Sequence, residues 1–182
     1  MADLWAGWSG GEQLKTNAMI NVVVKAPSEC SEEELNIFEA FVRRGGEVIA
    51  ANLRGRLERA HRLVFLFEGN KTLAGIAALK APDIHYKRKV FKKAGYEEDP
   101  NDFAFEAGWI YVEEQFRGRK YSRLLLAEVL RLAGDSRVYA TTREANEAMR
   151  RTNLRVGLEQ SGRPYQSDEG EYNLVLYTGG RR

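Results

Sequence analysis

A basic turn that contains one glycine runs from Arg117 to Arg123, between a predicted strand and a predicted helix. Because Gly118 interrupts this run, we expect the backbone N–H groups from about Arg117 to Ser122 to point outward at the positive end of the helix dipole. Such a turn can bind a diphosphate. Its cations would suit an anionic cofactor: Arg117, Arg119, Lys120 and Arg123. A basic turn can equally be solvated surface. The neighbouring segments therefore decide whether this turn is interpreted as a binding site.

Those neighbouring segments predict alternating strands and helices. The β-branched run MINVVVKAP, which ends at Pro27, is typical of a first buried strand. Ser31 and Glu34 form a capping box before a helix that Gly45-Gly46 ends. A second helix is expected from about Val48 to Arg59. The runs RLVFLFEGN and KTLAGIAALKAP then predict a hairpin joined by a Gly-Asn turn.

The second half of the chain continues the alternation. A polar insertion is expected to be helical from about Ile84 to Ala94, and FAFEAGWIYV predicts a strand that kinks at Gly108. A helix that Gly134 stops follows the basic turn. The strand VYATTR, a helix that ends at Gly157 and a hairpin around Glu169-Gly170 complete the chain.

The length and the 43% hydrophobic content predict one domain, over residues 19–182, preceded by a flexible arm at residues 1–18. The order of the expected strands and helices indicates the α+β class for this domain. A formal charge of +2 gives no global attraction to nucleic acid or anionic membrane. Cys30, His61 and His85 have no zinc-ligand spacing, so we expect no metal. No apolar run reaches the roughly 20 residues of a membrane span, and no signal peptide is recognisable, which together predict a cytoplasmic protein without a membrane partner.

The segment VEEQFRGRKYSRLLLAEVL resembles the acyl-CoA pyrophosphate motif of the GNAT superfamily of N-acetyltransferases. That motif has Gln or Arg, two further residues, Gly, one residue, then Gly or Ala, and Gln115 and Gly118 match it. The resemblance covers roughly residues 19–177, with AGIAAL, FEAGWIYV and VYATTR in the positions of the third to fifth strands. It implies a mixed, largely antiparallel sheet of about seven strands flanked by about four helices. It also implies an acetyl-CoA-dependent N-acetyltransferase.

Two positions depart from the family pattern. Lys120 occupies the second small position of the motif, where its ammonium could meet a phosphate oxygen. Asn153, seven residues after Asn146, replaces the Tyr that often protonates the departing thiolate, so no general acid is carried over. The cofactor-binding residues that the resemblance implies are Ile110, Tyr111, Val112, Gln115, Arg117, Gly118, Arg119, Lys120, Tyr121, Ser122, Asn146 and Asn153.

Acyl transfer to nitrogen needs a neutral amine, a polarised thioester carbonyl and a route for protons. Glu106, just before the expected kink, is the candidate general base, acting directly or through water; a surface or ion-paired glutamate is the alternative. The resemblance implies that N–H groups freed by the kink, around Ile110 to Val112, bind the pantetheine arm and the acyl oxygen. Three residues are candidates for the general acid, with none preferred: Tyr139, Tyr121 and Thr152. The hypothesis is that water delivers the proton and that Asn153 orients this water.

The sequence gives fewer indications of the residues that bind the acceptor. The insertion offers an apolar stripe at Tyr86, Val90 and Phe91 within a basic face. This face is either the solvated side of a lid helix or an acceptor site, at Tyr86 and Lys89, that favours an anionic group such as an amino acid carboxylate or a nucleotide. No stacking platform or recognition motif accompanies the charges, so nucleic acid is not an expected partner.

The expected acceptor is therefore the amine of a small molecule or peptide, with a homodimer left open. A non-catalytic acyl-CoA-binding or regulatory module stays an alternative because of Lys120 and Asn153. An adaptor that no longer binds CoA is a further alternative, against which Gln115 and Gly118 argue. P-loop, dinucleotide-binding and nucleophile-elbow patterns are missing from the sequence, so phosphoryl transfer, hydride transfer and serine hydrolysis have no support.

Overall fold

The computed structural model describes residues 19–46, 52–69 and 72–180. Its described strands form one sheet in the order β1-β2-β3-β4-β5-β7-β6. All neighbours are antiparallel except β4 and β5, which are parallel. The strands are Ile20–Lys25 (β1), Arg62–Glu68 (β2), Thr72–Lys80 (β3), Phe103–Val112 (β4), Arg137–Arg143 (β5), Glu159–Gln166 (β6) and Asn173–Gly179 (β7). The predicted mixed, largely antiparallel sheet is confirmed.

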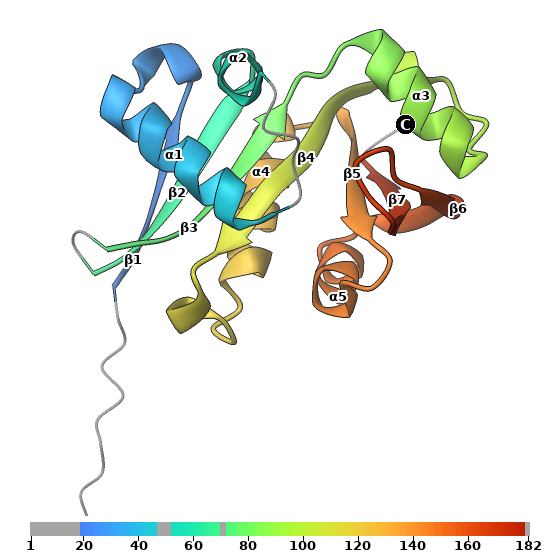
Figure 1. Cartoon of the computed structure of the whole chain (residues 1–182). Helices are drawn as coiled ribbons and strands as arrows, with labels where there is room; N and C mark the ends of the chain where they lie inside the picture. Colours follow the sequence, from blue (N-terminus) through green and yellow to red (C-terminus); the bar gives the residue numbers. More distant parts are fainter. Residues whose placement is uncertain (1–18, 47–51, 70–71, 181–182) are drawn as a thin grey trace, which may run out of the picture.

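Helices cover both faces of this sheet (Figure 1). The described helices are Glu32–Arg44 (α1), Leu53–Glu58 (α2), Ile84–Ala94 (α3), Tyr121–Ala133 (α4) and Glu147–Arg155 (α5). Helices α1, α2 and α3 lie on one face, where their apolar side chains form two separate clusters with the sheet. Helices α4 and α5 lie on the other face, over a single larger cluster. These five described helices agree with the segments that the sequence predicted as helical and with the roughly four helices that the resemblance implied.

Local sequence signals account for the helix ends. The Ser31 hydroxyl accepts from the Glu34 N–H at 3.2 Å while the Glu34 carboxylate accepts from the Ser31 N–H at 2.8 Å, so the predicted capping box is confirmed. Asp83 caps α3 by accepting from the N–H of Tyr86 at 3.0 Å. Helix α4 ends at Gly134, as expected.

Some expectations fall outside the described residues. The arm at residues 1–18 is one, and so are the expected start of the second helix near Val48 and the Asn70 end of the β2–β3 turn. The described part of that second helix begins at Leu53. Within the described residues, no helix is long and apolar enough to cross a bilayer.

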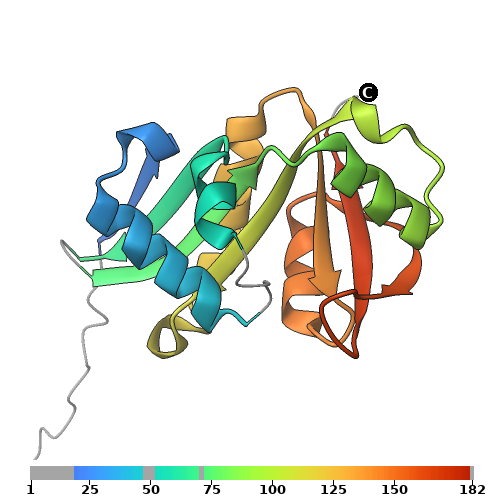
Figure 2. The same cartoon turned by 45° about the horizontal axis from the view of Figure 1, so that its top comes forward.

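The sheet opens in its middle, between β4 and β5. The two strands are paired only from Phe103 to Glu106 on β4 and from Arg137 to Tyr139 on β5. Beyond these residues they diverge, as Figures 1 and 2 show. The β5-facing edge of β4 from Ala107 to Val112 therefore has no strand partner among the described residues. Such an edge can bind an extended ligand through main-chain hydrogen bonds.

Candidate active site

A β-bulge at Trp109 and Ile110 turns β4 away from β5. Gly108 is opposite Ala78 on β3, whereas Tyr111 is opposite Ile76, so β4 has one residue more than β3 in this interval. Trp109 takes up the extra length in the left-handed conformation, with φ 51°. The predicted kink is therefore present, although the bulge lies just after Gly108, which stays in register with β3.

Gly108 has a different role, because it makes room for the side chain of Lys80. A Cβ atom at this position would lie 2.8 Å from Lys80 Cε and 3.1 Å from Lys80 Nζ. The Lys80 side chain crosses this gap, with Nζ 5.1 Å from the centre of the Trp109 ring. The glycine thus lets the Lys80 ammonium reach the neighbouring carboxylate.

That carboxylate belongs to Glu106, which lies at the vertex of the opening and is 3% exposed. Its Oε1 is 2.7 Å from Lys80 Nζ. Its Oε2 accepts from the Tyr139 hydroxyl at 3.4 Å. Glu106 is thus buried and ion-paired, yet it also lines the cavity described next. A carboxylate offers about four acceptor positions, so these two contacts leave capacity for a ligand.

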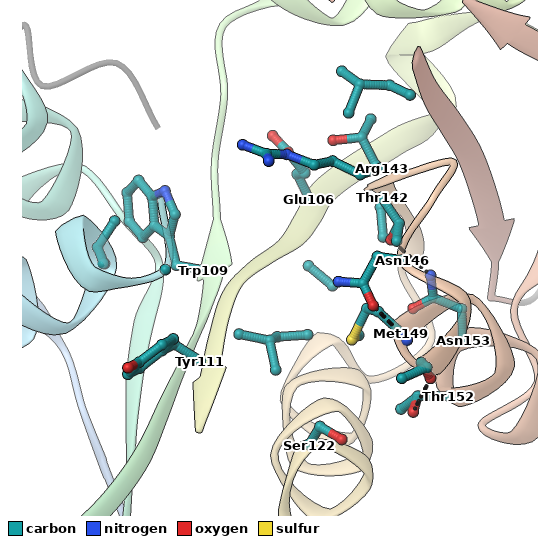
Figure 3. Close-up of a pocket in the computed structure, with 18 of the residues that line it drawn as sticks. Glu106, Trp109, Tyr111, Ser122, Thr142, Arg143, Asn146, Met149, Thr152 and Asn153 are labelled. Carbon is teal, nitrogen blue, oxygen red and sulfur yellow. Dashed lines mark hydrogen bonds between the residues drawn. The ribbon is translucent and has the colours of Figure 1, made fainter. Parts of the chain in front are cut away.

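A cavity of about 1170 Å³ follows the opening between β4 and β5. The start of α4 and the turn before it line one end, while α3 and the segment between β6 and β7 line the other. Figure 3 shows Glu106, Trp109 and Tyr111 from β4 on one side, and Thr142, Asn146 and Asn153 on the other. The cavity therefore brings together residues that are far apart in the sequence. The predicted cofactor residues in its lining are Ile110, Tyr111, Val112, Arg117, Gly118, Lys120, Tyr121, Ser122, Asn146 and Asn153.

The backbone of the turn before α4 has a geometry that can bind an anion. Gly118 has φ 80° and Lys120, the N-cap of α4, has φ 66°. In the described residues, none of the backbone N–H groups from Gly118 to Ser122 donates to another backbone group. The left-handed conformation at Lys120 suits the glycine of the family pattern, because glycine adopts it without strain.

Two residues predicted for cofactor binding lie outside the cavity lining. Gln115 is exposed in a short 3₁₀ turn. Arg119 forms an ion pair with Glu68 on β2, which also accepts from the Tyr121 hydroxyl. The hydrogen bond that Tyr121 donates lowers the pKa of Glu68, and the hydrogen bond that Arg119 donates lowers this pKa further. Arg119 thus fastens the turn to β2, whereas Arg117, Lys120 and Arg123 face the cavity.

Asn146 is the N-cap of α5, and Asn153 lies within this helix. The Asn146 side chain caps this helix by accepting from the N–H of Met149 at 3.0 Å. Asn153 is fully buried, and its Nδ2 donates to Thr142 Oγ1 at 2.9 Å (Figure 3). Its Oδ1 is buried without a partner in the described part of the chain. This oxygen can accept a hydrogen bond from a group in the cavity.

The three candidates for the general acid are all engaged elsewhere. The Tyr139 hydroxyl bonds Glu106, the Tyr121 hydroxyl bonds Glu68 and the Thr152 hydroxyl donates to the Ala148 carbonyl at 2.9 Å. Burial, and then the charge of Glu106, raise the pKa of Tyr139, which makes it a poor proton donor. These contacts favour none of the three as the acid.

Helix α3 lines the end of the cavity that lies away from the turn before α4. Tyr86 and Lys89, predicted as acceptor residues, both line the cavity. However, Lys89 and Lys93 both form ion pairs with Asp168, at 2.8 and 2.5 Å. Val90 and Phe91 are buried in the core beneath the helix. Two of the predicted cations are therefore already paired by an acidic side chain.

The sequence did not single out Lys80, Trp109 or Tyr165, which also line the cavity. Lys80 is opposite Glu106 across the β3–β4 pair, a relationship that the hairpin pattern could have indicated once its register was known. No local signal distinguishes Trp109 or Tyr165 from ordinary core aromatics. No group of three or more His, Cys, Asp or Glu side chains among the described residues could hold a metal ion.

Solved structures share this architecture. An acyl-CoA N-acyltransferase from Pseudomonas aeruginosa superposes with a TM-score of 0.65 at 13% identity, over 90% of this chain and 100% of that one. Escherichia coli ElaA gives 0.63 at 17% identity, over 90% and 100%. Salmonella typhimurium yncA, solved with its cofactor acetyl-CoA, gives 0.59 at 14% identity, over 90% and 94%. At these identities the likeness establishes the fold, which is that of the acyl-CoA acyltransferases.

The sequence itself assigns the family. The profile of the acetyltransferase (GNAT) family matches residues 31–157, and the chain belongs to this family. It is accordingly a transferase of acyl groups, with acetyl-CoA as its co-substrate. No protein with a curated description matches the sequence significantly.

Proposed function

We propose that the chain is an N-acetyltransferase whose acceptor is a primary amine of a small molecule or peptide. The amine attacks the acetyl thioester directly, in a ternary complex. The observation that carries the proposal is the position of Glu106, a buried carboxylate at the vertex between β4 and β5, in the wall of a cavity that begins at the turn before α4. A base and an anion-binding turn are thus joined by one cavity.

The residues at the turn fit the diphosphate of acetyl-CoA. A Cβ atom added to Gly118 would meet nothing within 4 Å, so the space beside this residue is open. A phosphate can therefore approach the backbone there. The unpaired N–H groups from Gly118 to Ser122 and the positive end of the α4 dipole favour negative charge. Arg117, Lys120 and Arg123 supply cations in the cavity lining.

The free edge of β4 fits an extended pantetheine arm. From Ala107 to Val112 this edge has no strand partner in the described part of the sheet, so its N–H and C=O groups can bond a ligand as a further strand would. The expected donors to the arm and to the acyl oxygen are the N–H groups around Ile110 to Val112. A donor aimed at the acyl oxygen stabilises the negative charge that develops there during attack.

Glu106 is the proposed general base. As the amine nitrogen attacks the acetyl carbon, Glu106 takes a proton from the nitrogen, the C–N bond forms and the C–S bond breaks. The departing thiolate takes its proton from solvent. Asn153 Oδ1, buried and unpartnered among the described residues, can accept from a water molecule and orient it toward the sulfur.

The proposal is tested by measuring release of free CoA from acetyl-CoA over a panel of amino acids, polyamines, aminoglycosides and peptide N-termini. We expect turnover with at least one primary amine and a rise in Tm with CoA. A rise in Tm with CoA but no turnover across the panel would favour a non-catalytic CoA-binding module instead. The cytoplasmic location and a homodimer stay predictions from the sequence.

A further inference from the structure

Tyr165 on β6 carries a buried hydroxyl with no hydrogen-bond partner among the described residues. The residue is 8% exposed, and its ring packs in the cluster that contains Phe91 and Tyr139. It also lines the cavity, as Glu106 does. A buried hydroxyl without a partner costs free energy, so its presence in a cavity wall points to a ligand group that supplies the missing bond.

The backbone holds Tyr165 in this position. Ser161 is opposite Leu176 on β7 and Tyr165 is opposite Leu174, so β6 has two residues more than β7 between these pairs. Gly162, within this bulge, has φ 69°, and a Cβ there would lie 2.3 Å from the Ala94 carbonyl oxygen. The bulge therefore sits tightly against the end of α3. A position determined by two elements is suited to orienting a substrate.

Glu106 and Tyr165 offer complementary hydrogen-bonding capacity. The contacts of the Glu106 carboxylate with Lys80 and Tyr139 leave it with further acceptor positions. Burial, and then the charge of Glu106, raise the pKa of Tyr165, so its hydroxyl keeps its proton. The phenolic oxygen still has lone pairs that can accept a hydrogen bond.

We propose that Glu106 and Tyr165 together form a subsite for the acceptor nitrogen that selects primary over secondary amines. This inference rests on the proposed function. A neutral primary amine has two N–H groups and one lone pair, and the lone pair must be free to attack. Glu106 accepts from one N–H and removes that proton as the C–N bond forms, while the Tyr165 oxygen accepts from the other. A secondary amine has one N–H and places an alkyl group against the buried phenol.

The test uses the best primary amine from the panel and its N-methyl analogue. With Tyr165→Phe, kcat/KM for the primary amine falls about tenfold, which is the value of one hydrogen bond, while the N-methyl analogue is little affected. The KM for acetyl-CoA stays at the wild-type value and the Tm does not fall, because the hydroxyl that is removed has no partner within the described residues. Tyr96→Phe is the matched control, since Tyr96 packs against the same cluster but lies outside the cavity lining.

Two results overturn the inference: an unchanged kcat/KM for the primary amine in Tyr165→Phe, or an equal loss for both amines. If Tyr165→Phe does not fold, Tyr165→Met also fills the space without a hydroxyl and carries the same expectation. Absence of turnover by the wild type with every amine would contradict the proposed function itself. The wild-type reaction therefore separates failure of the function from failure of the subsite.

Discussion

Lys80 Nζ lies 2.7 Å from Glu106 Oε1, across neighbouring strands, at the point where β4 leaves β5. The pair is almost entirely buried on the Glu106 side, with a side-chain exposure of 4%, and more open on the Lys80 side, at 18%. The ammonium therefore holds the carboxylate in place while the cavity keeps access to it. Because removal of one partner leaves the other buried and uncompensated, the pair can be tested from both sides.

Glu106→Gln tests the base. We expect kcat to fall by roughly 10²- to 10⁴-fold, because the amide cannot take a proton from the amine. The affinity for acetyl-CoA, measured by calorimetry, should stay unchanged because Glu106 lies away from the turn before α4. Glu159→Gln, an exposed substitution on β6, is the control. Wild-type kcat in Glu106→Gln would mean that the carboxylate is only structural.

Gly108→Ala tests the passage of Lys80. The new Cβ would lie 2.8 Å from Lys80 Cε, so the ammonium must move and its contact with Glu106 weakens. We expect a loss of about 1–3 kcal/mol in the free energy of unfolding, measured by denaturant titration. In a Lys80→Ala background the same substitution should cost much less. Equal costs in the two backgrounds would be inconsistent with this role of the glycine.

Substitutions of Lys120 test the backbone conformation of the turn before α4. Because its φ is 66°, Lys120→Gly should be more stable than Lys120→Ala by about 1 kcal/mol, as only glycine adopts this conformation freely. Both variants lose the ammonium, so both should bind CoA more weakly than the wild type. Thermal unfolding and calorimetric titration of the two variants separate strain from charge. Equal stability of the two variants would show that the conformation carries no strain.

Asn153→Ala tests proton delivery. We expect kcat to fall by up to about 10²-fold with an unchanged KM for acetyl-CoA, because the variant loses the oxygen that orients water. Thr142→Val breaks the same Asn153–Thr142 hydrogen bond but keeps that oxygen, so its kcat should remain near the wild-type value. If Asn153→Ala leaves both kcat and cofactor affinity unchanged, Asn153 has no part in the mechanism.

Features that depend on residues adjacent in the chain could be predicted from the amino-acid sequence. The capping box at Ser31, the bounds of α3 and the stop of α4 at Gly134 follow from caps, apolar periodicity and glycine. The place of the turn around Gly118, just before α4, could be predicted for the same reason, because its residues are consecutive. Phosphate binding at this turn stays a prediction. The resemblance to the GNAT family depends on this turn and on the order of the elements around it.

The contacts between residues that are distant in the chain could not be predicted in this way, because they depend on strand register and on bulges. The register of β3 on β4 brings Lys80 to Glu106, and the bulge at Trp109 separates β4 from β5. The bulge in β6 places the Tyr165 hydroxyl in the same cavity. A shift of one residue in a strand would turn each of these side chains to the other face of the sheet. Their meeting therefore depends on strand pairing across the whole domain, which local sequence does not encode.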